Sequence, residues 1–282
     1  MAPTVAVIAS GMMGSAVGKR LSDNGVRVTT VLTGRSEASA ARAREAGMVP
    51  VDEAEAVTAD VLMSIVPPGM ALSLAERLLP FLQANRRKPI YVDCNAVHPR
   101  TVENIAAVVT ATGCPFVDAG IIGGPPKPSY DGPIFYASGE AASRFATLGQ
   151  HGLKIRVLDG PVGAASAVKM SYAGITKGFT ALGAIMMLAA TREGTAETLH
   201  AELSQSQPAL LGWLTRVMPQ MYSKAYRWIA EMEEIAEFVS DDPAARQMLE
   251  GTARLYERLA ADFEGDKHEV DALSQFVKRG QS

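Results

Sequence analysis

The sequence predicts an α/β domain with a doubly wound, mostly parallel sheet, followed by an all-α domain. Three observations support this prediction. Through the first half of the chain, short apolar runs rich in β-branched residues alternate with helix-forming segments, which is typical of a parallel sheet. From Gly163 onward no strand pattern recurs, and Ala, Leu, Met and Glu dominate. The length of 282 residues suits two domains, which we place at residues 1–161 and 162–282.

Hydrophobic periodicity and turn residues give the order of the elements. Strands are expected at 4–9, 26–32, 61–65, 90–93, 115–119, 134–137 and 154–158, and helices at 15–24, 36–46, 71–79 and 101–112. The second half opens with an unusually long helix at about 164–191. Gly174, Gly178 and Gly183 lie along it and would let a neighbouring helix approach closely. The later helices are expected to break near Gly194, Pro208 and Pro243.

The composition is that of an ordinary soluble globular protein, with 48% hydrophobic and 20% charged residues. A net charge of −3 gives no general attraction to nucleic acid or to an anionic membrane, and we expect neither as a partner. No unbroken apolar run approaches the roughly 20 residues that span a bilayer, and we expect no signal peptide. Cys94 and Cys114 lack metal-site spacing, so we expect no metal and interpret both as reduced thiols in a cytoplasmic protein.

A glycine-rich turn follows the first predicted strand and opens the first helix. It reads IASGMMG at residues 8–14, the dinucleotide-binding pattern G-x-G-x-x-G with Ala9 in place of the first glycine. Gly11 allows the backbone to approach a pyrophosphate, and Gly14 allows the helix to pack on the strand. Free N–H groups at the helix start, around Met12 and Met13, attract the same anion. The turn therefore predicts a Rossmann domain, and a glycine-rich turn without a ligand is the alternative.

The end of the second strand predicts which dinucleotide is bound. A domain specific for NAD places Asp or Glu there to bind the ribose hydroxyls, but VLTGRS at residues 31–36 contains neither. Arg35 follows instead, flanked by Thr33, Gly34 and Ser36. A guanidinium group with neighbouring hydroxyls suits a 2′-phosphate, so we predict that the cofactor is NADP(H). The alternative interpretation of Arg35 is a solvated loop arginine.

Four further motifs follow the turn in order. They are SIVPPG at 64–69, DCNAVHP at 93–99, VDAGIIGG at 117–124 and GAASAVKM at 163–170. Together with the glycine-rich turn, this series resembles the β-hydroxyacid dehydrogenases, the superfamily that includes 6-phosphogluconate dehydrogenase and 3-hydroxyisobutyrate dehydrogenase. In the runs KMSYAGITKGFTAL (169–182) and RWIAEMEEIAEF (227–238), the helical half is similar to a branch with a C-terminal domain of unknown function.

The resemblance implies a role for each motif. Lys169 stands at the position of the family's catalytic lysine and would act as the general acid/base. Its place near the start of a long helix, where the dipole is positive, favours the neutral amine that a base requires. The residues at the other matching positions are Val66, Pro67, Pro68 and Asn95 on the nicotinamide side of the cleft, and Ile122, Gly123 and Gly124 in the substrate loop.

Departures from the family pattern leave the substrate open. Ile122 replaces a serine that normally helps to hold the substrate carboxylate. Tyr172 and Ala173 stand where the family has an asparagine, and Tyr172 is kept as a candidate for substrate binding. Lys177 lies eight residues after Lys169 on a similar face of the predicted helix, where it would bind an anionic substrate group or pair with a carboxylate. A short β-hydroxy acid is therefore not implied.

The predicted function is an NADP(H)-dependent oxidoreductase that transfers a hydride between the nicotinamide and a hydroxyl/carbonyl pair of a small molecule. An NADPH-dependent imine reductase shares this architecture and is one alternative, although such enzymes usually carry Asp or Tyr at the position of Lys169. A non-catalytic NADPH-binding or sensing protein is another. The long helix and the mean hydropathy of +0.08 favour a homodimer formed through the helical domain. Glu231, Glu234 and Glu237, at three-residue spacing, are expected on a solvated face.

Overall fold

The structure, a computed structural model, describes residues 2–8, 11–127, 130 and 132–279. The chain divides into two compact units, Met1–Met170 and Ser171–Ser282. The strands found in the described residues all lie in the first unit, and the second is helical. Helix α7 (Ala164–Arg192) begins in the first unit and continues into the second.

An eight-stranded sheet forms the centre of the first unit, with the strand order β3-β2-β1-β4-β5-β6-β7-β8. Neighbouring strands are parallel except for β6 and β7, so the doubly wound, mostly parallel sheet predicted from the sequence is confirmed. The strands are β1 (Thr4–Ile8), β2 (Arg27–Val31), β3 (Val49–Val51), β4 (Val61–Ser64), β5 (Ile90–Asp93), β6 (Phe116–Ile122), β7 (Ile134–Ser138) and β8 (Lys154–Val157).

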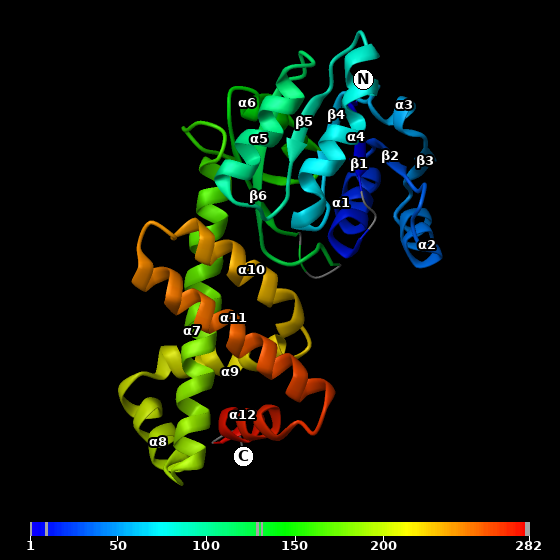
Figure 1. The fold of residues 1–282 in the computed structure, drawn as a ribbon. Helices are drawn as coiled ribbons and strands as arrows, with labels where there is room; N and C mark the ends of the chain where they lie inside the picture. Colours follow the sequence, from blue (N-terminus) through cyan, green and yellow to red (C-terminus); the bar gives the residue numbers. More distant parts are fainter. Residues whose placement is uncertain (1, 9–10, 128–129, 131, 280–282) are drawn as a thin grey trace. The chain divides into compact units, whose positions relative to one another are not determined.

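Helices cover both faces of this sheet (Figure 1). Val7 and Ile8 point to opposite faces because side chains alternate along a strand. Val7 belongs to an apolar cluster with Leu21 of α1, and Ile8 to a second cluster with Leu78 of α4 and Ile105 of α5. The helices of this unit, besides the start of α7, are α1 (Met12–Asp23), α2 (Glu37–Glu45), α3 (Glu53–Ala56), α4 (Ala71–Ala84), α5 (Pro99–Thr110) and α6 (Ala142–Phe145).

Several predicted boundaries were wrong by a few residues, and β3, α3 and α6 were missed. Helix α1 already begins at Met12, because Gly11 takes the extended conformation of an N-cap. Helix α4 continues to Ala84, beyond the predicted end at 79. Strand β6 runs on to Ile122 because it pairs antiparallel with β7. Strand β3 contains Pro50, which is tolerated because β3 lies at the edge of the sheet.

The second unit is all-helical, as predicted. Two of the three glycines in α7 allow the expected close approach: a Cβ added at Gly174 would lie 3.2 Å from Ile235, and one at Gly183 would lie 2.6 Å from Leu214. A Cβ at Gly178 would meet nothing within 4 Å. Helix α10 packs along α11. The remaining helices are α8 (Ala196–Ser206), α9 (Pro208–Tyr222), α10 (Ala225–Phe238), α11 (Pro243–Glu264) and α12 (His268–Lys278).

One face of α7 is apolar and exposed. We call it the α7 stripe, and its residues are Val168, Tyr172, Ile175, Phe179, Leu182 and Met186, with exposed fractions from 38% to 61%. Spacings of three and four residues keep them on one side of the helix. By length and composition alone, α7 could also cross a membrane. The core helices of soluble proteins can have the same length and composition, and 39% of the most apolar stretch of α7 is buried. The sequence shows no unbroken apolar run here because Lys177 interrupts it.

Candidate functional site

The predicted cofactor and substrate motifs meet at one edge of the sheet in the first unit. Strands β1, β4, β5 and β6 are parallel neighbours, so their carboxyl ends lie at the same edge. The connections change direction between β1 and β4, and open α/β sheets bind their ligands at such a switch point. The motifs at 8–14, 64–69, 93–99 and 117–124 contain the ends of these four strands.

Helix α1 presents its N-terminus at this edge. Its first helical hydrogen bond runs from Ser15 N to Gly11 O (2.9 Å), so the N–H groups of 12–14 precede the helical ladder. A Cβ added at Gly11 would meet no atom within 4 Å, so the space beside its backbone is open. Gly14 is buried in the packed side of α1. This arrangement fits a pyrophosphate at a helix N-terminus. Ala9 of the predicted set lies outside the described residues.

Arg35 lies at the end of a tight turn after β2. Its N–H donates to Leu32 O at 3.0 Å, and Gly34 within the turn has a φ of +72°, which glycine adopts without strain. Ser36 is the N-cap of α2, and its hydroxyl accepts an N–H of the first turn at 3.3 Å. Arg35 is half-buried, and Thr33 is exposed. A guanidinium group, two hydroxyls and a helix N-terminus thus gather after β2, a set that suits a phosphate group.

Asn95 links the ends of β4 and β5. Its side-chain oxygen accepts the Val66 N–H (2.7 Å), and its amide donates to Ser64 Oγ and Asp93 Oδ2 (2.9 Å each). The residue is 3% exposed. These bonds fix the start of the loop 66–68, which includes Pro67 and Pro68, and so shape the predicted nicotinamide side of the cleft. Direct contact of Asn95 with the cofactor stays a prediction.

Lys169 lies on the second turn of α7, against β6. A Cβ added at Gly120 would lie 3.0 Å from Lys169 Cβ and 2.7 Å from Ala165 O. Glycine at position 120 therefore lets the helix pass close over the strand, and a larger residue would displace Lys169. The lysine is half-buried. The predicted catalytic lysine thus lies beside the strand whose end carries the predicted substrate loop.

The substrate loop begins where β6 ends at Ile122. Gly123 has a φ of +125°, and a Cβ there would lie 2.6 Å from Tyr130 Oη, so a tight turn requires glycine. A Cβ at Gly124 would meet nothing within 4 Å. The first glycine therefore serves the fold, and the second leaves space in which a ligand has room.

Two buried carboxyl groups lie on neighbouring strands of this unit, and one of them, Asp118, was not among the predicted site residues. Asp93 of β5 and Asp118 of β6 are opposite each other, with 0% and 1% exposure. Burial raises the pKa of Asp93 to about 7, and the charge of Asp118 adds to the rise, whereas hydrogen bonds from Asn95 lower it. Burial also raises the pKa of Asp118, whereas hydrogen bonds from Ser166 and Gly163 lower it. The sequence does carry a signal for this residue, because Asp118 is an acid inside the apolar run FVDAGII. An acid buried in a strand needs hydrogen-bond partners, so its presence there predicts a structural or functional role.

The other two predicted substrate residues, Tyr172 and Lys177, belong to the second unit. Tyr172 is exposed in the α7 stripe. Lys177 pairs with Glu231 of α10, and its Nζ lies 5.2 Å from the ring centre of Trp228. The expectation that Lys177 could pair with a carboxylate is confirmed. The placement of Glu231 on a solvated face was wrong, because its side chain is only 20% exposed beside this lysine.

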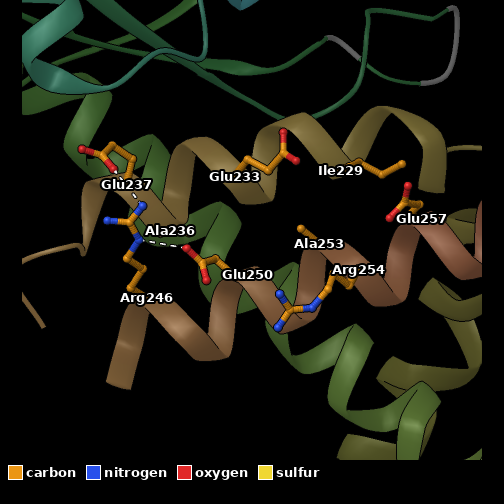
Figure 2. A pocket seen from close by; sticks show the side chains of 9 residues that line it. All are labelled: Ile229, Glu233, Ala236, Glu237, Arg246, Glu250, Ala253, Arg254 and Glu257. Carbon is orange, nitrogen blue, oxygen red and sulfur yellow. Dashed lines mark hydrogen bonds and ion pairs between the residues drawn. The ribbon is translucent and has the colours of Figure 1, made fainter. Parts of the chain in front are cut away.

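A hollow of about 360 Å³ opens between α10 and α11 in the second unit (Figure 2). Arg246 lies between Glu237 and Glu250 there, with N–O distances of 3.8 and 2.8 Å. We assign this hollow no ligand, because no predicted site residue lines it. In the described part of the chain, no group of three or more His, Cys, Asp or Glu residues is arranged to hold a metal ion.

The fold and this edge define a class of protein, the dinucleotide-binding Rossmann proteins, because a doubly wound sheet carries a glycine turn and an open helix N-terminus at its switch point. Residues 4–149 match the family described as NAD binding domain of 6-phosphogluconate dehydrogenase. The chain belongs to that family. Residues 190–259 match a second family, described as Domain of unknown function (DUF1932). The resemblance stated from the motifs is therefore confirmed for both halves.

Proteins with a similar sequence or structure match most of the chain. An uncharacterized 28.5 kDa protein of Methanothermus fervidus is 29% identical over 184 residues, 64% of this chain and 69% of that protein. A conserved protein of unknown function, described as structurally similar to 3-hydroxyacid dehydrogenases, is 29% identical, with a TM-score of 0.72 over 93% of this chain and 98% of that one. The 3-hydroxyisobutyrate dehydrogenase of Mycobacterium tuberculosis is 22% identical, with a TM-score of 0.72 over 96% and 99%.

Imine reductases share the fold as well. The enzyme from Myxococcus stipitatus in complex with NADP⁺ is 19% identical, with a TM-score of 0.56 over 98% of this chain and 100% of that one. A variant of it in complex with NAD⁺ is 21% identical, with a TM-score of 0.60 over 99% and 100%. At these identities the likeness concerns the fold alone.

Proposed function

We propose that the protein is an NADP(H)-dependent oxidoreductase that interconverts a hydroxyl and a carbonyl group of a small molecule, with Lys169 as the general acid/base. One observation carries the proposal: Lys169 packs over Gly120 on β6, the strand that leads into the substrate loop. The nicotinamide, when bound, supplies or accepts the hydride. Lys169 Nζ gives a proton to the carbonyl oxygen during reduction or takes one from the hydroxyl during oxidation. The loop at 66–68, whose start is held by Asn95, would line the nicotinamide when it is bound.

A substrate screen that follows NADPH absorbance tests this proposal. Carbonyl compounds are offered with NADPH, alcohols and hydroxy acids with NADP⁺, and Lys169→Ala is run beside the wild type. The matched control is Lys19→Ala, because Lys19 is an exposed α1 lysine whose amine pairs with Asp23. We expect Lys169→Ala to bind NADPH normally and to lose turnover, with Lys19→Ala unchanged. Turnover of Lys169→Ala at the wild-type rate would refute the assignment.

For the cofactor we propose NADP(H) over NAD(H), supported by the cationic turn after β2. Arg35→Ala should raise the Kd for NADPH about 10- to 30-fold, because a charge-assisted hydrogen bond contributes roughly 1.5–2 kcal/mol and about 1.4 kcal/mol corresponds to tenfold. The Kd for NADH should stay within about twofold. Arg44→Ala serves as the control, because Arg44 lies on α2, the helix that follows this turn, and pairs with Glu37. Equal losses of the two cofactors would show that Arg35 does not read the 2′-phosphate.

An imine reductase is the second candidate, favoured by the shared fold across 98% of the chain. It predicts turnover of cyclic imines with NADPH and none of carbonyl compounds in the same screen. A non-catalytic NADPH-binding protein, suggested by Ile122 in place of the family serine, predicts tight NADPH binding without turnover of any compound offered. The three functions therefore give three different results in one assay.

We also propose a homodimer, formed when the α7 stripe of one copy packs on that of a second. An exposed apolar stripe that holds six large side chains and no charge is typical of an association surface. The three- and four-residue spacing is that of a seam between two helices, and a stripe of this kind is complementary to its own copy across a two-fold axis. A monomeric mass by light scattering at micromolar concentration would refute the dimer. Binding of that monomer to lipid vesicles would point to a membrane surface instead.

For the compartment we propose the cytoplasm. Cys94 and Cys114 are both buried and free, which suits a reducing environment. Fractionation of cells that express the tagged protein checks this assignment, and recovery in the membrane fraction would contradict it.

A further inference from the structure

Asp118 of β6 collects hydrogen bonds that the proposed function has not yet used. Its Oδ2 accepts the backbone N–H groups of Gly163 (3.0 Å) and Ser166 (2.9 Å). Its Oδ1 accepts the Ser166 hydroxyl at 2.7 Å, and Oδ2 also accepts the Ser138 hydroxyl at 3.3 Å. A carboxylate that is 1% exposed therefore has four donors around it.

Three of these four donors belong to the start of α7. The first N–H groups of a helix have no partner within the helix. Gly163 directly precedes α7, and Ser166 is its third residue, so Asp118 binds the two positions that a capping box would serve. Its negative charge also faces the positive end of the helix dipole. The Ala165 N–H between them donates to Ser138 Oγ (3.1 Å), so β6 and β7 together hold the first turn.

The same strand also holds Lys169. Asp118 and Gly120 are two residues apart on β6, so they lie on one face of the strand. Lys169 follows Ser166 by three residues and Ala165 by four, so these three residues lie on one side of α7. The closest approach is at Gly120, where an added Cβ would lie 3.0 Å from Lys169 Cβ. Asp118 fixes the rotation of the first turn about the helix axis, and Gly120 fixes how closely the second turn lies on the strand.

We infer that Asp118 is the positioning residue for Lys169: from β6 it holds the first turn of α7 so that the lysine side chain leaves the helix directly over Gly120. The catalytic meaning of this placement rests on the proposed function. An error of about 1 Å in the position of a reacting group can cost about 100-fold in rate, so a helix start that is free to rotate is expected to be costly.

A double-mutant cycle tests the link between the two residues. Asp118→Ala removes the cap, and we expect kcat to fall about 30- to 100-fold while the Kd for NADPH stays within about twofold. In the Lys169→Ala background the same change should have no further effect on kcat, because the group that it positions is gone. An equal fall of kcat in both backgrounds would overturn the inference. Asp118→Asn, which keeps the shape and one acceptor oxygen, should restore part of the rate.

A second measurement does not depend on activity. The rate of reductive methylation of each lysine is followed by peptide mass spectrometry in the wild type and in Asp118→Ala, with Lys19 as the internal reference. We expect the rate at Lys169 to change at least threefold and the rate at Lys19 to stay constant. An unchanged rate at Lys169 in the folded variant overturns the inference. A wild type without turnover, together with a changed rate at Lys169, would refute the proposed function and leave the positioning role intact.

A variant that keeps the cap protects both tests against misfolding. If Asp118→Ala loses its native circular dichroism spectrum, Gly120→Ala takes its place, because the added methyl would contact Ala165 O and Lys169 Cβ. It should lower kcat and change methylation at Lys169 in the same way. Ser138→Ala, which leaves both backbone bonds to Asp118, should produce a smaller effect on each readout. Native behaviour of Lys169 in Gly120→Ala would overturn the inference.

Discussion

The two parts of α7 differ in how they are held. The first part, through Met170, is fixed by polar contacts: Asp118 and Ser138 accept its first N–H groups, and its second turn lies close on β6. The second part, from Ser171 on, carries the α7 stripe, apart from Val168, on one side and the pair of Lys177 with Glu231 on another. Directional hydrogen bonds give a precise position, whereas an apolar stripe supplies area without direction.

Two lysines of this one helix therefore have different surroundings and different proposed roles. Lys169 lies beside the strand that leads into the substrate loop. Lys177 has its charge met by Glu231 and the face of Trp228, and Tyr256 donates its hydroxyl to Lys177 O at 2.6 Å. A lysine beside the substrate loop suits the proposed chemistry, whereas a lysine paired inside a cluster of side chains favours stability. The following changes test that division, from the largest expected effect to the smallest.

The largest effect is expected at Lys169. Lys169→Met keeps the length of the side chain but removes the amine, and kcat should fall about 10²- to 10⁴-fold because general acid/base catalysis is lost. The free energy of unfolding should change by less than about 0.5 kcal/mol, since methionine keeps the apolar stem of this half-buried side chain. Steady-state kinetics and urea denaturation of the same preparation check both parts. A large loss of stability would place Lys169 with Lys177 as a structural lysine.

The second effect concerns association. Phe179→Glu places one charge in the α7 stripe of each copy, so two charges would be buried in the proposed dimer. We expect its Kd to rise about 100-fold or more, because an unpaired buried charge is costly. Sedimentation velocity measures the change. Met248→Glu is the control, because Met248 is 67% exposed and lies on α11, outside the stripe. An unchanged Kd for Phe179→Glu would show that the dimer uses another face.

The third effect is a pH dependence of stability. It comes from Asp93, which lies on β5 opposite Asp118. The pKa of Asp93 is about 7 in the folded protein and close to 3.9 when unfolded, so the folded state holds its proton over a wider range. Stability therefore falls as pH rises from about 4 to about 7 and levels off above. From pH 5 to pH 8 this contribution should amount to about 2–3 kcal/mol. Urea unfolding of the wild type and Asp93→Asn isolates it as the difference between the two. A difference that does not depend on pH would contradict the buried, neutral carboxyl.

The smallest effect is expected at Lys177. Lys177→Met should lower the free energy of unfolding by about 1–2 kcal/mol, because it leaves Glu231 without its cation in a place that is only 20% exposed. The kcat should change less than about threefold, in contrast to Lys169→Met. Combining Lys177→Met with Glu231→Leu should recover stability, since an apolar pair avoids the unmet charge. A large loss of kcat with native stability would make Lys177 the substrate-binding residue that the sequence suggested.

Much of the cofactor edge could be predicted from the sequence because its signals are local. The glycine turn at 8–14, the cationic turn at Arg35 and the period of the apolar runs depend on a few neighbouring residues. Backbone freedom, helix N-termini and alternation of side chains follow from such short patterns alone. The sequence therefore determined the Rossmann unit, the helical second half and the placement of Lys169 on a long helix.

Only the tertiary structure decided which distant groups meet. Asp118 binds the start of α7 across 45 and 48 residues of sequence, and Lys177 meets Glu231 from another helix. No periodicity encodes such pairs, because they depend on how elements pack rather than on the residues beside them. The same holds for the α7 stripe, since an apolar helix face looks alike in sequence whether a neighbour covers it or leaves it exposed. The packed fold assigned one face of α7 to the interior and left the other open.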